Sequence, residues 1–188
     1  MIILLDCDGV LSHFTIGAHR WASSRGIGPF TDEQITDYDI MKSFGVGSEN
    51  WESFRAWLTG TRFCREAPVF EGAEAFVDQL RKLGDVIVVT APFVGVDHWE
   101  ADRRDWLKRH FGFGHKDIIS CHRKDVIRGH VLIDDNLEHC EAFVSKSSYR
   151  RAVVVDRPYN RQRAASGTHV MARARSYGEV LKVLEAAT

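Results

Sequence analysis

The apolar residues of this chain fall into short unbroken runs that are separated by stretches of helical periodicity. The runs cover residues 1–5, 86–89, 118–119, 131–133 and 152–155. A short apolar run bounded by turn residues is typical of a strand buried on both faces, as in a parallel sheet. Because helical stripes occupy the intervals, the pattern predicts an α/β fold: a parallel sheet flanked by helices, connected by right-handed crossovers.

The helices are predicted from apolar residues spaced three or four positions apart. One helix is expected to end at Gly84 and another at Gly112, since glycine readily adopts the backbone conformation that closes a helix. Ser176 and Glu179 form a capping box that predicts the start of the last helix. The clearest stripes are Phe76, Leu80 and Leu83; Trp99, Arg103, Trp106 and His110; and Tyr177, Val180, Leu181 and Leu184.

Residues 15–67 interrupt this alternation with helical character only. Thr31 and Gln34 form a capping box that predicts a helix running toward Gly45, and Ser48 is expected to cap the next helix. The chain is therefore predicted to have a core made of residues 1–14 and 68–188, with a small helical cap, residues 15–67, inserted after the first strand. The cap is rich in aromatic residues, among them Phe44, Trp51, Phe54, Trp57 and Phe63.

The composition limits the size of the hydrophobic core, the kinds of partner and the cellular location that we expect for this protein. With 188 residues, 44% of them hydrophobic, the chain can bury one core and carry a small insertion. A net charge of -1 without charge runs disfavours polymeric nucleic acid and membrane surfaces as partners, and no apolar stretch reaches the length of a membrane span. The four cysteines form no CxxC pair and the nine histidines match no zinc-ligand spacing. Reduced cysteines, and a Met1 that leads directly into a strand, favour a cytoplasmic location.

Polar residues follow each of the first four predicted strands. In an open parallel sheet the carboxyl ends of the strands border the ligand site, so these residues are expected to converge. Repetition at four separate strand ends is a more specific signal than one Asp-x-Asp-Gly turn. The residues are Asp6 and Asp8, Thr90, Lys124, and Asp134 with Asp135.

This set of residues predicts a phosphate site that contains a divalent cation. Two carboxylates about 4 Å apart repel by roughly 4 kcal/mol at an effective dielectric constant near 20, so four of them repel a phosphate dianion unless a cation is bound. All the candidate ligands are oxygens, which favours Mg2+. Lys124 would add a positive charge, and the Thr90 hydroxyl with neighbouring N–H groups would donate hydrogen bonds to phosphoryl oxygens.

The strings DCDGV, VVTAP and IDDN, with Lys124 between the last two, resemble in order and spacing the four motifs of the haloacid dehalogenase (HAD) superfamily of aspartate-nucleophile phosphotransferases. The cap position and the strings TAPF, FGFGHKDIISCHRKDVIRGHVLIDDN and PYN resemble the 5'(3')-deoxyribonucleotidase family within it, over most of the chain. That family commonly has Ser after the motif Thr. Here the position is Ala91, which retains only its N–H for phosphate.

The resemblance implies a Rossmann-like HAD fold and a Mg2+-dependent phosphomonoesterase that hydrolyses 5'- or 3'-(deoxy)nucleoside monophosphates through an aspartyl-phosphate. Asp6 would be the nucleophile, and Asp8 would protonate the leaving oxygen and later activate water. Asp6, the backbone carbonyl of Asp8 and the pair Asp134 and Asp135 would hold Mg2+. Which aspartate of the pair binds directly is left open, as is the formation of a homodimer.

The substrate is the least determined part of this prediction. We expect at least one of four cap aromatics, Phe44, Trp51, Phe54 and Trp57, to stack on a base, with Phe44 and Trp51 as the leading candidates. If all four only pack inward, the alternative is a HAD phosphatase of a sugar phosphate or another small metabolite, because the cap sets specificity. A phosphate-binding module without turnover is disfavoured, since both Asp6 and Asp8 are present. Residues 158–161 are expected to border the same crevice.

Overall fold

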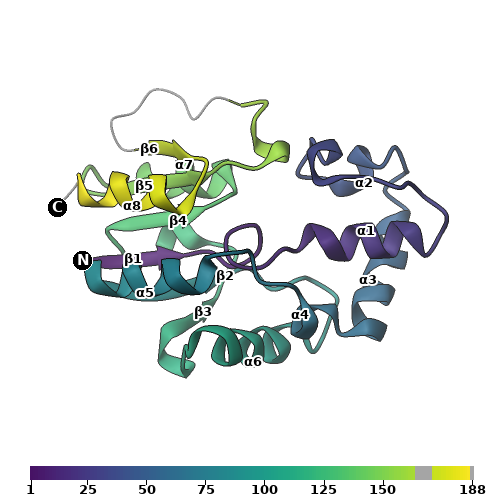
Figure 1. The fold of residues 1–188 in the computed structure, drawn as a ribbon, viewed down its shortest axis with the longest axis horizontal. Helices are drawn as coiled ribbons and strands as arrows, with labels where there is room; N and C mark the ends of the chain where they lie inside the picture. The colour runs from purple at the N-terminus through teal and green to yellow at the C-terminus, as the bar shows by residue number, and fades with distance from the viewer. Residues whose placement is uncertain (164–170, 187–188) are drawn as a thin grey trace.

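The strands that the structure describes, six in number, form a single parallel sheet. The computed structural model describes residues 1–163 and 171–186. In this part of the chain the strand order is β3-β2-β1-β4-β5-β6, and every neighbouring pair is parallel (Figure 1). The predicted α/β fold is therefore confirmed. The strands are β1 (Ile2–Leu5), β2 (Asp85–Thr90), β3 (Ile118–Ser120), β4 (Val131–Asp134), β5 (Arg151–Val155) and β6 (Met171–Ala174).

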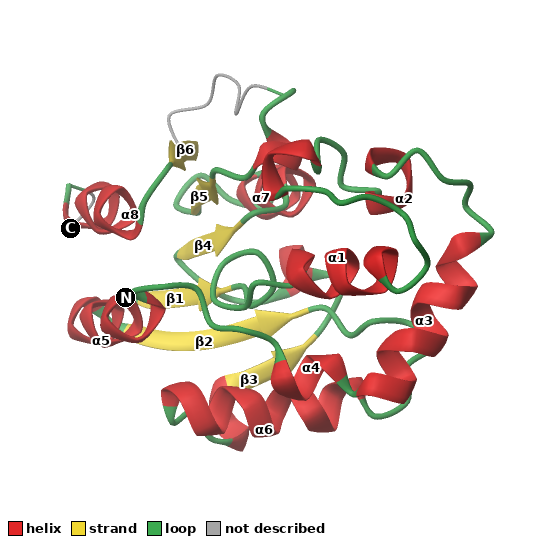
Figure 2. Cartoon of the chain, turned by 45° about the vertical axis from the view of Figure 1, so that its right-hand side comes forward, coloured by secondary structure: helices red, strands yellow, loops and turns green. Residues whose placement is uncertain are grey.

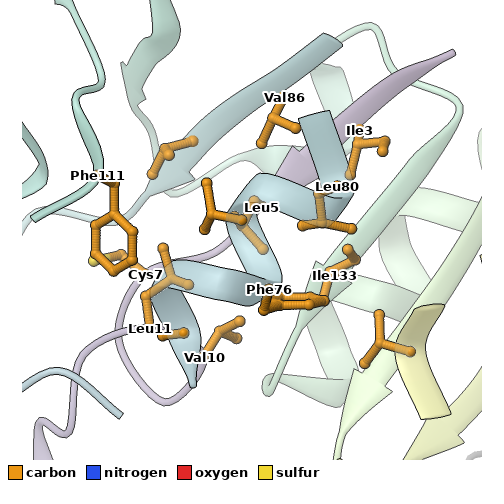
Figure 3. Packing of buried hydrophobic residues seen from close by; sticks show 14 of the residues in the cluster. Ile3, Leu5, Cys7, Val10, Leu11, Phe76, Leu80, Val86, Phe111 and Ile133 are labelled. Atoms are coloured by element: carbon orange, nitrogen blue, oxygen red, sulfur yellow. The ribbon is translucent and has the colours of Figure 1, made fainter. Parts of the chain in front are cut away.

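Helices cover both faces of the sheet because successive side chains of a strand point in opposite directions. Ile3 and Leu5 belong to one core cluster with residues of α5, α6 and α8, whereas Leu4 packs with residues of α7 (Figure 2). Phe76 and Leu80 of α5 lie in the first cluster (Figure 3). These helices are α5 (Ala73–Leu83), α6 (Trp99–Phe111), α7 (Leu137–Val144) and α8 (Tyr177–Glu185).

The direction in which the sheet grows reverses at β1. The chain runs from β1 through β2 to β3 on one side, and then from β4 through β5 to β6 on the other. Since ligands of open α/β sheets bind at the carboxyl edge near such a reversal, the topology places a crevice beyond the ends of β1 and β4. Three 3-10 turns lie in the connections, η2 (His115–Asp117), η3 (Lys124–Val126) and η4 (Pro158–Asn160).

The segment after β1 is helical, as expected. Its buried residues, among them Trp21, Phe54 and Leu58, form a cluster of their own that also includes Trp99 of α6. Both ribbon views show this segment beyond the end of the sheet, on the side toward which β1 and β4 point (Figures 1 and 2). Its elements are α1 (Thr15–Ser23), η1 (Asp32–Gln34), α2 (Ile40–Ser43), α3 (Asn50–Thr61) and α4 (Phe63–Glu66).

Two helix predictions in this segment were wrong. The Thr31 and Gln34 capping box is present, but the helix after it is only the 3-10 turn η1. The carboxylates of Asp37 and Asp39 accept backbone N–H groups two residues ahead, which makes turns that compete with a continuing helix. Ser48 does not cap α3, because the cap position is Glu49 and no side chain bonds there.

The last strand was not predicted. The residues of β6, Met-Ala-Arg-Ala, contain no apolar run, and the strand pairs only with β5 at the sheet edge. The Ser176 cap is confirmed, since its hydroxyl accepts the N–H of Glu179 at 3.2 Å. Across the described residues no helix is both long and apolar enough to cross a lipid bilayer. All four cysteines are free thiols.

Candidate active site

Three aspartates at the ends of β1 and β4 form a buried cluster at the carboxyl edge of the sheet. One carboxylate oxygen from each of Asp6, Asp134 and Asp135 lies within 4.8 Å of the others. The register explains their meeting: Leu5 pairs with Ile133, so the next residue of each strand is an aspartate at the same level. The aspartates that end these two hydrophobic runs therefore lie close together, as the sequence predicted.

Lys124 places one positive charge inside this cluster. Its Nζ donates to Asp6 Oδ1 at 2.5 Å and to Asp134 Oδ2 at 2.7 Å, and the side chain is only 1% exposed. Burial lowers the pKa of Lys124, but the two carboxylates outweigh burial and leave the pKa well above its ordinary value. The lysine is therefore a permanent ammonium ion.

One ammonium does not balance three carboxylates, and the pKa values reflect the excess of two negative charges. Burial raises the pKa of Asp6 to about 6, and burial together with Asp6 raises the pKa of Asp135 well above its usual range. Burial also raises the pKa of Asp134, but Lys124 and His139 overcome it, and the value is about 2. A divalent cation would supply the missing charge, and its preference for oxygen ligands matches these carboxylates.

The loop at η4 fixes the Asp135 end of the cluster. Tyr159 donates its hydroxyl to Asp135 Oδ2 at 2.5 Å, and the side-chain amide of Asn160 donates to the Asp135 carbonyl at 2.8 Å. Pro158, Tyr159 and Arg161 line the cavity over the site, so the expectation that residues 158–161 border the crevice is confirmed. Sequence reasoning placed this loop but missed the partnership between Tyr159 and Asp135.

Asp8 lies in a different environment from Asp6. Its Oδ1 accepts a hydrogen bond from Arg103 Nη2 at 2.5 Å, and its side chain remains 27% exposed. Arg103 is 1% exposed and lies 5.3 Å from the ring centres of both Trp99 and Trp106. Sequence reasoning listed Arg103 in an apolar helical stripe, and a charged residue in such a stripe was the signal that a buried counterion would be needed.

A cavity of about 1080 Å³ opens above these groups. Of the predicted site residues it is lined by Asp6, Asp8, Thr90, Ala91, Lys124, Asp135 and Trp51. Thr90 is at the tip of β2 and is 2% exposed. Asp134 lies behind this surface, where it bonds to Lys124. The polar strand ends therefore meet in one cavity.

The cap aromatics divide into two groups. Trp51 lines the cavity, 6.1 Å from Phe93 between ring centres. Phe44 does not, because it is 6% exposed and stacks on Phe30 at 4.5 Å. Phe54 is fully buried at the centre of the cap cluster, and Trp57 packs against that cluster. Of the four expected candidates, only Trp51 therefore faces the space where a ligand would lie.

Comparison with known proteins agrees with this site. The family model "5' nucleotidase, deoxy (Pyrimidine), cytosolic type C protein" matches residues 1–187. The chain belongs to this family. A 5'(3')-deoxyribonucleotidase of Bacillus subtilis (strain 168) is 30% identical over 161 residues, which cover 85% of this chain and 87% of that protein. The family assignment makes the chain a phosphatase of the nucleotidase group, as the motifs implied.

Solved structures support the same fold for this nucleotidase-family protein. A haloacid dehalogenase-like hydrolase from Streptococcus pneumoniae superimposes with a TM-score of 0.65 at 15% identity, covering 97% of each chain. A HAD-type hydrolase from Bacillus subtilis, whose structure is bound to magnesium, gives a TM-score of 0.57 at 14% identity over 97% of each chain. At these identities the likeness establishes the HAD fold alone.

Proposed function

We propose that this protein is a Mg2+-dependent phosphomonoesterase that hydrolyses 5'- or 3'-(deoxy)nucleoside monophosphates through an aspartyl-phosphate on Asp6. The observation that carries the proposal is the contrast between two carboxylates two residues apart. Asp6 lies within a buried charge cluster, whereas Asp8 is partly exposed and paired with Arg103. Carboxylates in such different environments suit different roles, one as nucleophile and one as acid and base.

The reaction has two steps. An oxygen of Asp6 bonds to phosphorus as the bond from phosphorus to the nucleoside oxygen breaks, and Asp8 gives its proton to that leaving oxygen. Asp8 then takes a proton from water as the water attacks the aspartyl-phosphate, which releases phosphate and restores Asp6. Arg103 holds Asp8 in place for both transfers, because its bond is short and its own position is fixed between two indole rings.

Magnesium fits the excess negative charge of the cluster. Asp6, the backbone carbonyl of Asp8, and the pair Asp134 and Asp135 would hold it, and the likeness to a magnesium-bound HAD hydrolase supports this assignment. When bound, the cation neutralises charge on the phosphoryl oxygens. Lys124 adds a further positive charge beside Asp6.

Hydrogen bonds from the end of β2 would orient the phosphoryl group. Thr90 offers its hydroxyl, and Ala91 offers a backbone N–H at the cavity wall. Because Ala91 lacks a hydroxyl, phosphate binding at this position depends on the backbone alone. Thr90 and Lys124 would then be the two side chains that donate hydrogen bonds to the phosphoryl oxygens.

Residues 15–67 would act as the cap that recognises the nucleoside. They contain the cluster around Trp21 and Phe54, and they contribute Tyr38, Trp51 and Arg55 to the cavity wall. A base stacked on Trp51 would lie over the catalytic edge, and such stacking contributes about 1–3 kcal/mol per base. The free cysteines and the family's cytosolic type support a cytoplasmic location for the reaction.

A substrate panel tests this function. Phosphate release should be measured for deoxy- and ribonucleoside 5'- and 3'-monophosphates, glucose 6-phosphate and p-nitrophenyl phosphate, with Mg2+ and after its removal by EDTA. We expect kcat/KM to be highest for nucleoside monophosphates and activity to disappear in EDTA. A preference for glucose 6-phosphate over every nucleotide, or full activity in EDTA, would contradict the proposal.

A further inference from the structure

The η4 loop contacts both the charge cluster and the cap. On one side, the Tyr159 hydroxyl donates to Asp135 Oδ2 at 2.5 Å. On the other side, the ring of Tyr159 lies edge-on to the ring of Tyr38, a cap residue, with 5.8 Å between ring centres and 80° between ring planes. One side chain therefore joins a candidate metal ligand to the cap.

The hydroxyl end of this contact leaves the Asp135 carboxylate little freedom. A Cβ atom at Gly9 would overlap both Asp135 Oδ2 and the Tyr159 hydroxyl oxygen, so the two groups pack directly against the backbone of the first loop. Asp135 Oδ2 is occupied by the tyrosine, and no described residue donates a hydrogen bond to Oδ1. The hydroxyl of Tyr159 therefore fixes the carboxylate so that Oδ1 is left for a cation.

The ring end of the contact lies where the cap meets the core. Two other bonds cross the same junction: Arg161 donates to Glu33 at 2.7 Å, and the Gln162 side chain donates to the Thr36 carbonyl at 3.1 Å. Both bonds are exposed, and exposed pairs of this kind contribute little to stability. The docking of this part of the cap therefore depends on where the η4 loop places the Tyr159 ring.

Cation binding and cap docking would both order this one side chain. A cation bound to Asp135 would hold the carboxylate and, through the hydroxyl, the Tyr159 ring. A docked cap would hold the same ring through Tyr38. Two binding events that order the same group favour each other, and by linkage each strengthens the other by the same factor.

We propose that Tyr159 is a positioning residue for the cation site, and that its contact with Tyr38 couples cation binding to the docking of cap residues 32–38 on the η4 loop. The inference rests on the proposed function, because the cation is the Mg2+ of that function. It adds a coupling within the same site: the cap docks more tightly when the cation is bound, and the cation binds more tightly when the cap is docked.

Calorimetric titration of the protein with Mg2+ alone tests the positioning role. Tyr159→Phe keeps the ring and removes the hydroxyl, and we expect the affinity for Mg2+ to fall about ten-fold or more, as when a metal-binding carboxylate loses its hydrogen-bond donor. Tyr177→Phe is the matched control, because that hydroxyl donates to the Val10 carbonyl at 2.6 Å and not to an aspartate. It should bind Mg2+ as the wild type does. Equal affinities of the wild type and Tyr159→Phe would overturn the positioning role.

Hydrogen exchange of the cap tests the coupling. In the wild type, saturating Mg2+ should slow amide exchange of residues 32–38 several-fold, and Tyr38→Ala should remove this slowing and lower the affinity for Mg2+ by the same factor. Tyr149→Ala should change neither quantity, because Tyr149 is as exposed as Tyr38, 57% against 58%, and does not line the cavity. Exchange at residues 32–38 that is the same with and without Mg2+ in the wild type would overturn the coupling. If the wild type bound no Mg2+ at all, the Mg2+ site of the proposed function would be wrong, and the coupling with it.

Discussion

Arg103 offers the sharpest test of how this site works, because its loss should slow the hydrolysis of nucleotides much more than that of an ester with a good leaving group, a difference that lost stability does not produce. The perturbation is Arg103→Met, which keeps a long unbranched side chain between Trp99 and Trp106 and removes the charge that holds Asp8. Arg104→Met on the same helix is the matched control, since that guanidinium donates to the Ile118 carbonyl and does not line the cavity.

The change in unfolding free energy is a difference between opposing contributions. The variant loses a charge-assisted hydrogen bond to Asp8, about 1.5–3 kcal/mol, and two cation–π contacts of about 0.5–2 kcal/mol each. It also removes a buried charge whose Nε has no hydrogen-bond partner, which relieves a cost of about 1–3 kcal/mol. These contributions leave a net destabilisation of about 3 kcal/mol, the middle of their combined range.

The loss of catalytic rate, unlike the loss of stability, is not offset by an opposing contribution. General acid–base catalysis contributes typically 10²–10⁴-fold, so releasing Asp8 from Arg103 should lower kcat for nucleotides by about a hundred-fold. Arg103→Lys, which keeps the charge but not the paired N–H groups, should recover part of this loss.

The assay is single-turnover phosphorylation with a nucleotide and with p-nitrophenyl phosphate, alongside urea unfolding of each variant. Since a good leaving group needs no proton in the transition state, p-nitrophenyl phosphate should lose much less rate than the nucleotide. A folded Arg103→Met protein with nucleotide rates within two-fold of wild type, or with equal losses on both substrates, would refute this role.

Further predictions concern the charge cluster and the cap. Asp6→Asn should abolish turnover and leave the protein folded, because an amide is a very poor nucleophile; a tenth of the wild-type rate would contradict covalent catalysis. Burial raises the pKa of Asp6 from 3.8 to about 6, so the metal-free folded state binds more protons than the unfolded state between these values, and its unfolding free energy should rise by up to about 3 kcal/mol as the pH falls from 7 to 4. Urea titrations in EDTA measure this gain, which should shrink in Asp6→Asn, where Asp135 still titrates, and shrink with Mg2+; a gain of the same size in all three states would disprove its assignment to Asp6. Trp51→Leu should lower kcat/KM for nucleotides about ten-fold or more and spare p-nitrophenyl phosphate, whereas Phe54→Leu should destabilise the cap and impair both; parallel losses on both substrates in folded Trp51→Leu would remove the stacking role.

The sequence by itself determined the sheet and the edge that carries the site. Strands buried on both faces are continuously apolar, so the unbroken apolar runs of the sequence predicted β1, β2, β4 and β5. The carboxyl ends of parallel strands lie at the same edge of the sheet. The aspartates at the ends of β1 and β4 were therefore predicted to lie close to Thr90 at the end of β2. Where the pattern was weak the prediction failed: β6 has no apolar run, and turns made by Asp37 and Asp39 ended a helix whose capping box was present.

Only the tertiary structure decided which side chains meet across long stretches of chain. Asp8 and Arg103 are 95 residues apart, and no local pattern specifies that α6 docks with this arginine against the first loop. The sequence gives no reason to prefer Trp51 over Phe44 as the residue that stacks on a base. In the folded protein Trp51 lines the cavity, whereas Phe44 stacks on Phe30. Local sequence sets strands and turns, whereas partners are chosen by the packing of whole elements, and the roles of these residues follow from that packing.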